Sequence, residues 1–348
     1  MKIVVSLIIF SIIILFHELG HFLLAKRAGI KVNEFSLGLG PTIFGVQKGE
    51  TKYSLKLLPF GGACMMEGED EDSTLENSFG NKSVWARISV VAAGPIFNFI
   101  MAFVFSFVII CVTGYDLPVL LDVTPGYAAA EAGLQAGDVL LEMNGKNIHF
   151  YRDVSAYSMY HAGEPIELVY ERDGERYTTE LVPKYDEALG RYLYGFVGSA
   201  GREKSTNNVF TLAKYSVYEV GYWIDSTIQS LRLLVTGGVS VNDMSGPVGI
   251  VNAIGDSYEA SVSYGIGYAV LQMMYISVFL SANLGVMNLL PIPALDGGRL
   301  VFLVIEAIRG KKINPEKEGM VHLIGLVLLL LLMAVIMLND IKRIFIGM

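Results

Sequence analysis

Four stretches of this sequence are apolar over a length that can cross a lipid bilayer. A transmembrane helix needs roughly 20 predominantly apolar residues. The stretches run from about residue 3 to 25, 88 to 112, 266 to 290 and 321 to 338. Of the 348 residues, 53% are hydrophobic and only 17% are charged, whereas about 25% are charged in an ordinary soluble chain. The sequence therefore predicts a polytopic α-helical membrane protein with about four transmembrane helices, for which the lipid bilayer is a partner.

Charge and cysteine content exclude other classes of protein. The net charge of −8 argues against a nucleic-acid partner. Two cysteines, Cys64 and Cys111, are too few for a disulfide framework or a cysteine-rich zinc site. The first apolar stretch has no small-residue cleavage site, so we expect it to be a helix of the protein and not a removed signal peptide.

The distribution of Lys and Arg predicts the orientation of the spans. Residues 26–87 carry eight of these side chains and residues 299–317 carry five, so both short loops should be cytoplasmic. The longer stretch between the second and third spans then lies outside, as do both termini. Lys2, Lys342 and Arg343 conflict with this assignment.

The segment between the first two spans has the character of β-structure. Phe35 to Gly40 and Lys52 to Leu58 are short runs separated by Gly and Pro, which favours strands. The acidic run 67–72 predicts a solvated loop.

The polar stretch after the second span predicts a small α/β domain. Strands are expected at 119–123 and 138–143, a short helix at 128–134, and a hairpin of 166–172 with 175–182 across Asp173-Gly174. Residues 209–235 are amphipathic and predict a helix on the membrane surface, with a fifth span as the alternative.

The first span contains the sequence His17-Glu18-Leu19-Gly20-His21. Two His at positions i and i+4 share one helical face and can reach one Zn²⁺, while Glu18 can act as the base toward water. About 21 Å of helix separates Ile3 from His17, which places the motif inside the hydrocarbon near the cytoplasmic side. Ionisable groups at that depth need partners, and zinc would satisfy all three.

A catalytic zinc commonly has a third protein ligand. The third span ends in Asn288-Leu289-Leu290-Pro291-Ile292-Pro293-Ala294-Leu295-Asp296-Gly297-Gly298. Asp296 is the one acid between Glu259 and Glu306, and the prolines predict broken backbone that lines a polar cavity. We therefore expect Asp296 to be the third ligand, although a helix N-cap is an alternative role.

HELGH in the first span and NLLPIPALDGG in a later one resemble the site-2 protease family, and within it the bacterial regulator-of-sigma-E protease branch. The resemblance extends over nearly the whole chain. It implies that His17, His21 and Asp296 bind one zinc ion per chain and that Glu18 activates water. It also implies that Asn288 helps to hold the substrate strand. Gly94-Pro95-Ile96-Phe97-Asn98 matches the family's GPxxN motif, in which Asn98 either orients the site or bonds between helices.

The same resemblance extends to the other segments. Residues 35–66 resemble the family's membrane-associated β-structure, whose edge can pair with an unwound substrate. Residues 119–182 resemble a PDZ domain through the pattern AGLxxGDxLxxxNG, and there is room for one such domain. The motif Ser245 to Ile250 also matches the branch, and we expect it to be a structural turn.

These expectations define four regions. Residues 1–112 would hold two spans, the HExxH motif and the β-rich segment, and residues 113–186 an extracytoplasmic PDZ domain. Residues 187–262 would form a linker and the surface helix, and residues 263–348 the last two spans.

The expected function is regulated intramembrane proteolysis in the bacterial inner membrane, with the active site towards the cytoplasmic side. The resemblance implies single-span substrates, such as anti-sigma factors or remnant signal peptides, that another protease has already trimmed outside. The PDZ domain would bind a carboxy-terminus or exclude untrimmed substrates. The alternatives are a metal-dependent transporter or sensor, which would be expected to show repeated halves, and an inactive PDZ scaffold, which would not need Glu18.

Three other histidines have no expected role in the chemistry. His322 lies at the beginning of the fourth span and has no second metal-binding residue at i+4, so we expect it to be an interfacial or packing residue. His149 and His161 lie in the outer domain and are expected at its surface.

Overall fold

The computed structural model describes residues 1–69, 73–198, 202–203, 208–238 and 245–346. The chain divides into two compact units, and each is considered by itself. The first contains Met1–Phe105 and Leu234–Met348, and the second contains Ser106–Leu233.

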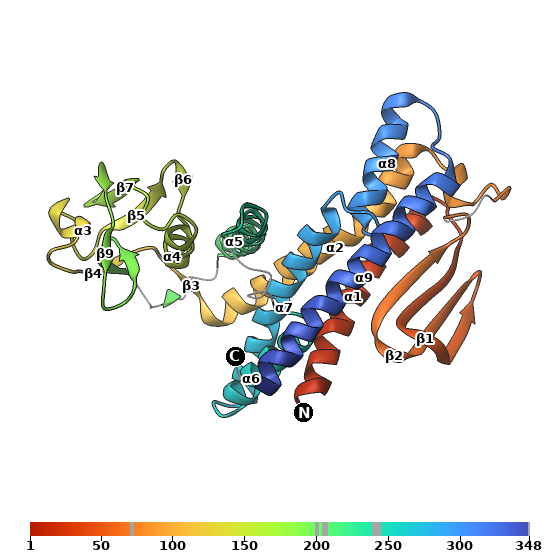
Figure 1. The fold of residues 1–348 in the computed structure, drawn as a ribbon, viewed down its shortest axis with the longest axis horizontal. Coiled ribbons are helices and arrows are strands. Elements are labelled where there is room, and N and C mark those ends of the chain that lie inside the picture. Colours follow the sequence, from red (N-terminus) through yellow and green to blue (C-terminus); the bar gives the residue numbers. More distant parts are fainter. Residues whose placement is uncertain (70–72, 199–201, 204–207, 239–244, 347–348) are drawn as a thin grey trace. The chain divides into compact units, whose positions relative to one another are not determined.

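Long apolar helices form most of the first unit (Figure 1). Its helices are α1 (Lys2–Arg27), α2 (Val84–Thr113, which ends in the second unit), α6 (Pro247–Val262), α7 (Ile266–Leu289), α8 (Asp296–Arg309) and α9 (Pro315–Ile346). Within the described residues, four helices are long and apolar enough to cross a membrane, namely α1, α2, α7 and α9. The prediction of four transmembrane helices is confirmed at this level.

Small residues let α1, α2 and α7 approach closely, as is common between membrane helices. A side chain at Gly20 of α1 would collide with the backbone carbonyl of Ala93 in α2. The hydroxyl of Ser281 in α7 donates to the backbone oxygen of Asn98 in α2 at 2.9 Å. These contacts fix the spacing of the helices that carry the sequence motifs.

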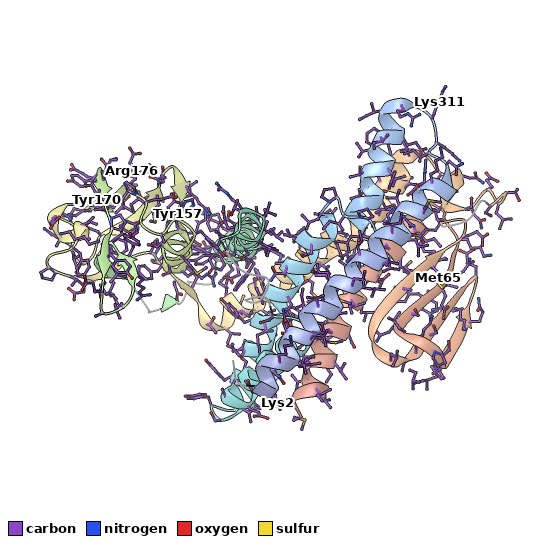
Figure 2. All side chains as sticks on the ribbon, in the orientation of Figure 1. Lys2, Met65, Tyr157, Tyr170, Arg176 and Lys311 are labelled. Carbon is purple, nitrogen blue, oxygen red and sulfur yellow. The ribbon has the colours of Figure 1, made fainter. Side chains whose placement is uncertain are left out.

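Helix α6 is anchored at both ends. Lys2 of α1, which is labelled in Figure 2, pairs with Asp256 at 2.6 Å and with Glu259 at 3.3 Å. At the other end, the buried Asp340 carboxylate of α9 accepts the backbone N–H groups of Gly246 at 3.0 Å and Gly249 at 2.8 Å. The Ser245–Ile250 motif is thus the beginning of α6, where a carboxylate satisfies N–H groups that have no partner within the helix.

The predicted β-rich segment is one long hairpin. Strands β1 (Val32–Lys48) and β2 (Thr51–Met66) each fold back, so that Phe35 faces both Cys64 and Tyr53. The fold-back points contain glycines with positive φ, Gly38 at 89° and Gly61 at 86°, which other residues rarely adopt. Residues 62–66 form one edge of this sheet and residues 42–48 the other.

The acidic run that follows β2 differs in part from its prediction as a solvated loop. Glu67 accepts hydrogen bonds from Asn33 and Ser73, and Glu69 forms an ion pair with Arg299 of α8. Both carboxylates are only partly exposed, because the chain turns back here against its own unit. Residues 70–72 of the run lie outside the described residues.

The second unit has a central four-stranded antiparallel sheet in the order β6-β5-β7-β8. These strands are β5 (Val139–Met143), β6 (Lys146–Asn147), β7 (Ile166–Arg172) and β8 (Glu175–Leu181). Helix α3 (Ala128–Glu131) precedes β5, and helix α4 (Tyr151–Tyr160) connects β6 to β7. The other strands are β3 (Tyr115–Asp116), β4 (Leu120–Val123), β9 (Lys184–Asp186), β10 (Arg191–Leu193), β11 (Phe196–Gly198) and β12 (Arg202–Glu203).

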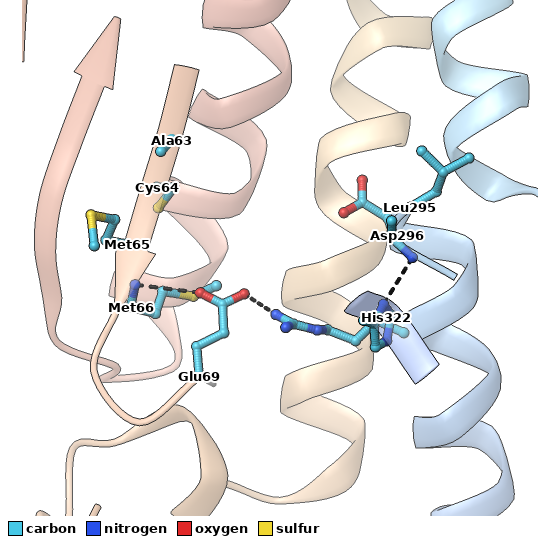
Figure 3. Close-up of a pocket in the computed structure, with 10 residues that line it drawn as sticks. Ala63, Cys64, Met65, Met66, Glu69, Leu295, Asp296 and His322 are labelled. Carbon is cyan, nitrogen blue, oxygen red and sulfur yellow. Dashed lines mark hydrogen bonds and ion pairs between the residues drawn. The ribbon is translucent and has the colours of Figure 1, made fainter. Parts of the chain in front are cut away.

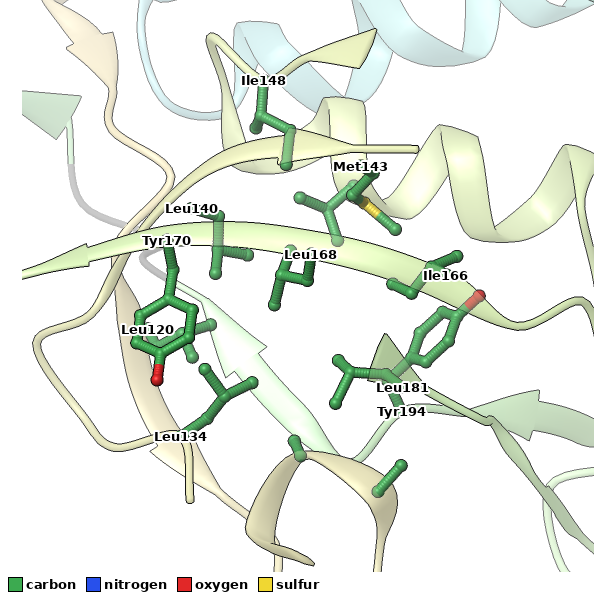
Figure 4. Packing of buried hydrophobic residues seen from close by; sticks show 13 residues of the cluster. Leu120, Leu134, Leu140, Met143, Ile148, Ile166, Leu168, Tyr170, Leu181 and Tyr194 are labelled. Carbon is green, nitrogen blue, oxygen red and sulfur yellow. The ribbon is translucent and has the colours of Figure 1, made fainter. Parts of the chain in front are cut away.

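This unit contains two tight turns and an apolar core, and one of the turns is the predicted turn at Asp173-Gly174. Asn144 and Asp173 have φ of 47° and 53°, as tight hairpin turns require. Leu140, Ile166 and Leu168 are fully buried at the centre of the core (Figure 4). The α/β character expected from the sequence is therefore correct.

Helix α5 (Val209–Thr236) is attached to the second unit through polar and aromatic side chains. Arg152 of α4 pairs with the buried Glu219, and its guanidinium lies 4.4 Å from the centre of the Tyr222 ring. His149 stacks on Tyr218 at 3.5 Å, so it is a packing residue more than a surface one. The predicted helix is confirmed, and α5 is not among the four candidate spans; its position on a membrane surface stays a prediction.

Candidate metal centre

Three side chains from the two ends of the chain meet in the first unit. His17 and His21 lie one turn apart on α1, with Nε2 atoms 3.3 Å from each other. Asp296 is the first residue of α8, and its Oδ2 atom lies 3.2 Å from Nε2 of His17 and 3.6 Å from Nε2 of His21. Among the described residues, this is the one group of three His, Cys, Asp or Glu side chains with the spacing of a metal site.

The spacing and the hydrogen bonding of these atoms fit zinc. Ligand bonds of roughly 2.0–2.1 Å in tetrahedral geometry place ligand atoms about 3.3 Å apart, and the separations here are 3.2, 3.3 and 3.6 Å. Oδ2 of Asp296 is buried and accepts no hydrogen bond. A buried carboxylate oxygen without a donor is costly unless a cation is its partner.

The far side of each imidazole is held by α2. Nδ1 of His21 lies 2.9 Å from the backbone oxygen of Val90, so Nδ1 carries the proton and Nε2 presents its lone pair to the centre. Nδ1 of His17 lies 3.1 Å from Nδ2 of the buried Asn98. The opposite orientation of this amide, which exchanges Nδ2 and Oδ1, would let the oxygen accept the Nδ1 proton and would give a partner to an oxygen that otherwise has none.

Gly94 provides the space in which the two imidazoles lie. A β-carbon at this position would overlap the His21 ring and would lie 2.7 Å from Cε1 of His17. The glycine of the Gly94-Pro95-Ile96-Phe97-Asn98 motif is therefore required for packing the histidines, and Asn98 lies one turn further along the same helix.

The side chain of Glu18 extends from α1 toward the edge of the β1–β2 hairpin. A side chain at Gly62 of β2 would lie 3.1 Å from Cγ of Glu18 and 2.9 Å from Ile14, so β2 passes directly over α1 here. The backbone N–H of Cys64 is within hydrogen-bonding reach of the Glu18 carboxylate. The carboxylate is thus positioned beside the strand edge formed by residues 62–66.

Asn288 lies in the last turn of α7, and its side-chain nitrogen is 3.5 Å from Nε2 of His17. All six residues expected from the sequence therefore lie in one region: His17, Glu18 and His21 on α1, Asn98 on α2, Asn288 on α7 and Asp296 on α8.

A cavity of about 340 Å³ lies beside Asp296 (Figure 3). Residues 63–66 of β2 form one wall, and Asp296 and His322 lie on another. The ion pair of Glu69 with Arg299 also lines the cavity. Sequence reasoning did not assign Glu69, Arg299 or His322 to the site, because an ion pair or backbone contact between distant segments leaves no local pattern.

Comparison with known proteins identifies the family. The model of peptidase family M50 matches residues 5–332. The chain belongs to peptidase family M50. This family comprises the site-2 proteases, so the resemblance inferred from HELGH and NLLPIPALDGG is confirmed.

Relatives of this M50 peptidase match over nearly their whole length. A predicted zinc metalloprotease of Clostridium acetobutylicum is 37% identical, with 98% of this chain and 97% of that protein covered. Zinc metalloprotease RasP of Bacillus licheniformis is 34% identical, with 99% of each chain covered. The regulator of sigma-W protease RasP of Bacillus subtilis is 33% identical, again with 99% of each covered.

These relatives establish the activity and the cofactor. The M50 peptidase is an intramembrane zinc protease, and its cofactor is zinc, as the sequence predicted. The transporter and scaffold alternatives are not supported.

Among solved structures, the PDZ domain of an SdrC-like protein from Listeria monocytogenes is 18% identical to this chain. It covers 25% of this chain and 90% of that one, with a TM-score of 0.21, which is too low to carry an argument.

Proposed function

We propose that His17, His21 and Asp296 hold the zinc ion and that Glu18 is the catalytic base of the protease. The observation that carries this proposal is the triangle formed by Nε2 of His17, Nε2 of His21 and Oδ2 of Asp296, whose sides are 3.2, 3.3 and 3.6 Å. Oδ2 of Asp296 is buried and accepts no hydrogen bond. When bound, zinc supplies Lewis-acid chemistry, because it lowers the pKa of water and polarises a carbonyl.

Protein side chains carry out proton transfer, stabilise the oxyanion and orient the ligands. Glu18 takes a proton from the attacking water and transfers it to the leaving amine nitrogen. Its place beside residues 62–66 brings this base to the strand edge along which an extended substrate can pair. The side-chain amide of Asn288 donates to the developing oxyanion, and Asn98 holds the His17 ring in its metal-binding tautomer.

The proposed substrate is the transmembrane segment of a single-span membrane protein whose outer domain has already been removed by another protease. A transmembrane helix must unwind before cleavage, since its amides are bonded internally. One relative is named a regulator of sigma-W protease, which supports a membrane-bound anti-sigma factor as one substrate, with remnant signal peptides as another. The bacterial relatives support a location in the bacterial inner membrane, and the Lys and Arg of the short loops support a centre near its cytoplasmic side.

We assign the outer domain, about residues 113–186, as a single PDZ domain that excludes untrimmed substrates. A PDZ domain binds peptides by adding a strand to a sheet edge. Strand β11, which lies just beyond these residues, pairs with β4 in a two-stranded sheet, and a side chain at Gly198 would overlap the ring of Tyr151 from α4. The Tyr151 ring therefore covers one face of β11, and the preference for a steric role over capture of a carboxy-terminus rests on the resemblance to the family.

The test of this function uses the full-length protein in liposomes with two model substrates that share one transmembrane segment. One carries a folded outer domain and the other has lost it. We expect cleavage of the trimmed substrate and little cleavage of the intact one. Equal cleavage of both would remove the gating role, and cleavage of neither would count against single-span proteins as substrates.

A further inference from the structure

Ala294 has a backbone conformation that its side chain disfavours. Its φ is 78°, in the left-handed region. Among the described residues, two other residues that are not glycine have a positive φ, namely Asn144 and Asp173. Both lie in hairpin turns, where Asn and Asp tolerate this conformation. Ala294 has neither a polar side chain nor a hairpin turn to stabilise this conformation, so other contacts must hold it.

Those contacts come from α9. The backbone N–H of Ala294 donates to Nδ1 of His322 at 3.0 Å (Figure 3). Three residues further along the same face of α9, a side chain at Gly325 would lie 2.7 Å from the backbone oxygen of Pro293. His322 and Gly325 therefore allow α9 to lie directly against the turn formed by Pro293 and Ala294.

The ring of His322 is itself held in place. It packs against Phe302 of α8 with ring centres 5.7 Å apart, and Nε2 lies 3.9 Å from a carboxylate oxygen of Glu318. The side chain is only 17% exposed. These contacts leave Nδ1 directed at the Ala294 backbone.

The turn leads directly into the metal centre, because Asp296 follows Ala294 by two residues. Gly297 and Gly298 let the start of α8 pack on this same turn, since β-carbons there would overlap the backbone of Leu290 and Ile292. We propose that His322 is a positioning residue, which holds the Ala294 turn so that Oδ2 of Asp296 meets His17 and His21. This inference rests on the proposed role of Asp296 as a zinc ligand.

The experiment measures metal retention in the purified full-length protein, apart from activity. We expect His322→Ala to lose zinc to a chelator roughly 10–100-fold faster than the wild type, as is typical when a group that supports a ligand is removed. Its cobalt-substituted form should show a changed visible spectrum. His322→Asn can place an acceptor oxygen near the position of Nδ1 and should retain much of the metal. Leu323→Ala, on an exposed part of the same helix, is the matched control and should behave as the wild type.

A second variant tests the route through Ala294. Glycine adopts a positive φ without strain, so Ala294→Gly in the His322→Ala background should restore most of the lost zinc retention. No restoration, or an unchanged cobalt spectrum in His322→Ala, would overturn the proposal. Asp296→Ala is measured in parallel. If it keeps its zinc, the ligand assignment fails; if it loses zinc while His322→Ala does not, only the positioning role of His322 fails.

Discussion

Oδ2 of Asp296 lies 3.2 Å from Nε2 of His17, although the two residues lie near opposite ends of the chain. The contact joins the start of α8 to the middle of α1. It exists because α1 packs on α2 at Gly20, because α7 packs on α2 at Ser281, and because α9 supports the turn before Asp296. The proposed zinc site of this M50 peptidase therefore depends on contacts among five helices, and its variants can test each of them.

Glu18→Gln should abolish proteolysis without removing the metal. Gln keeps the size of the side chain but cannot accept and return a proton, a function worth roughly 10²–10⁴-fold in rate. Cleavage of a trimmed single-span substrate measures the activity, and elemental analysis measures the zinc. Cleavage at the wild-type rate in this variant would contradict the role of Glu18.

Removal of the metal should inactivate the protein reversibly. Treatment with 1,10-phenanthroline should stop cleavage, and added zinc should restore it, because the imidazoles of His17 and His21 are oriented by α2 and not by the ion alone. The same zinc addition should not restore Asp296→Ala, which lacks the third proposed ligand. Recovery of Asp296→Ala to the wild-type rate would exclude this residue from the ligand set.

Gly94→Ala should disrupt the centre through one methyl group. The new carbon would overlap the His21 ring and press on His17, so both imidazoles must move. Because a displacement of about 1 Å can cost 10²-fold in rate, we expect a loss of that order together with weaker zinc binding. Gly319→Ala in α9 is the control, since nothing lies within 4 Å of its added carbon. Equal behaviour of the two variants would show that Gly94 has no packing role.

Asp340→Asn should weaken the attachment of α6 to α9. An amide presents one oxygen and one N–H group to the backbone donors of Gly246 and Gly249, whereas the carboxylate presents two oxygens. The loss of a buried charge-assisted bond costs about 1–3 kcal/mol, and a lower melting temperature in detergent would reveal it. Leu338→Ala, which removes an exposed side chain of the same helix, should change the melting temperature less.

Cys64 should be unreactive until the pH is far above neutral. Burial raises the pKa of its thiol well above the ordinary value, and the thiolate is the reactive form. In the variant Cys111→Ser, alkylation by iodoacetamide at pH 8 should be slow in the folded protein and fast in denaturant. Rapid labelling of the folded protein would show that Cys64 is accessible and ionised near neutral pH.

Much of the site was predictable because its signals are local. HELGH places two imidazoles on one face of a helix by helical geometry alone, and the break at Pro291 and Pro293 marks the end of α7. The turn at Asp173-Gly174 likewise specifies its hairpin through backbone conformation. His322 and Glu69 could not be found in this way, because their partners are a backbone N–H and an Arg far away in the sequence.

The sequence by itself determined the four apolar helices, the β-rich segment and the α/β unit, and it singled out the residues that we propose for the metal centre. Apolar length, turn chemistry and the i, i+4 spacing act over short distances along the chain, so they can be read without a fold. Only the tertiary structure decided how Asp296 is brought to the two histidines, which helix supports its turn, and why Gly94 has no side chain. These depend on close approaches between helices, where the position of one atom is set by residues that are neighbours only in space.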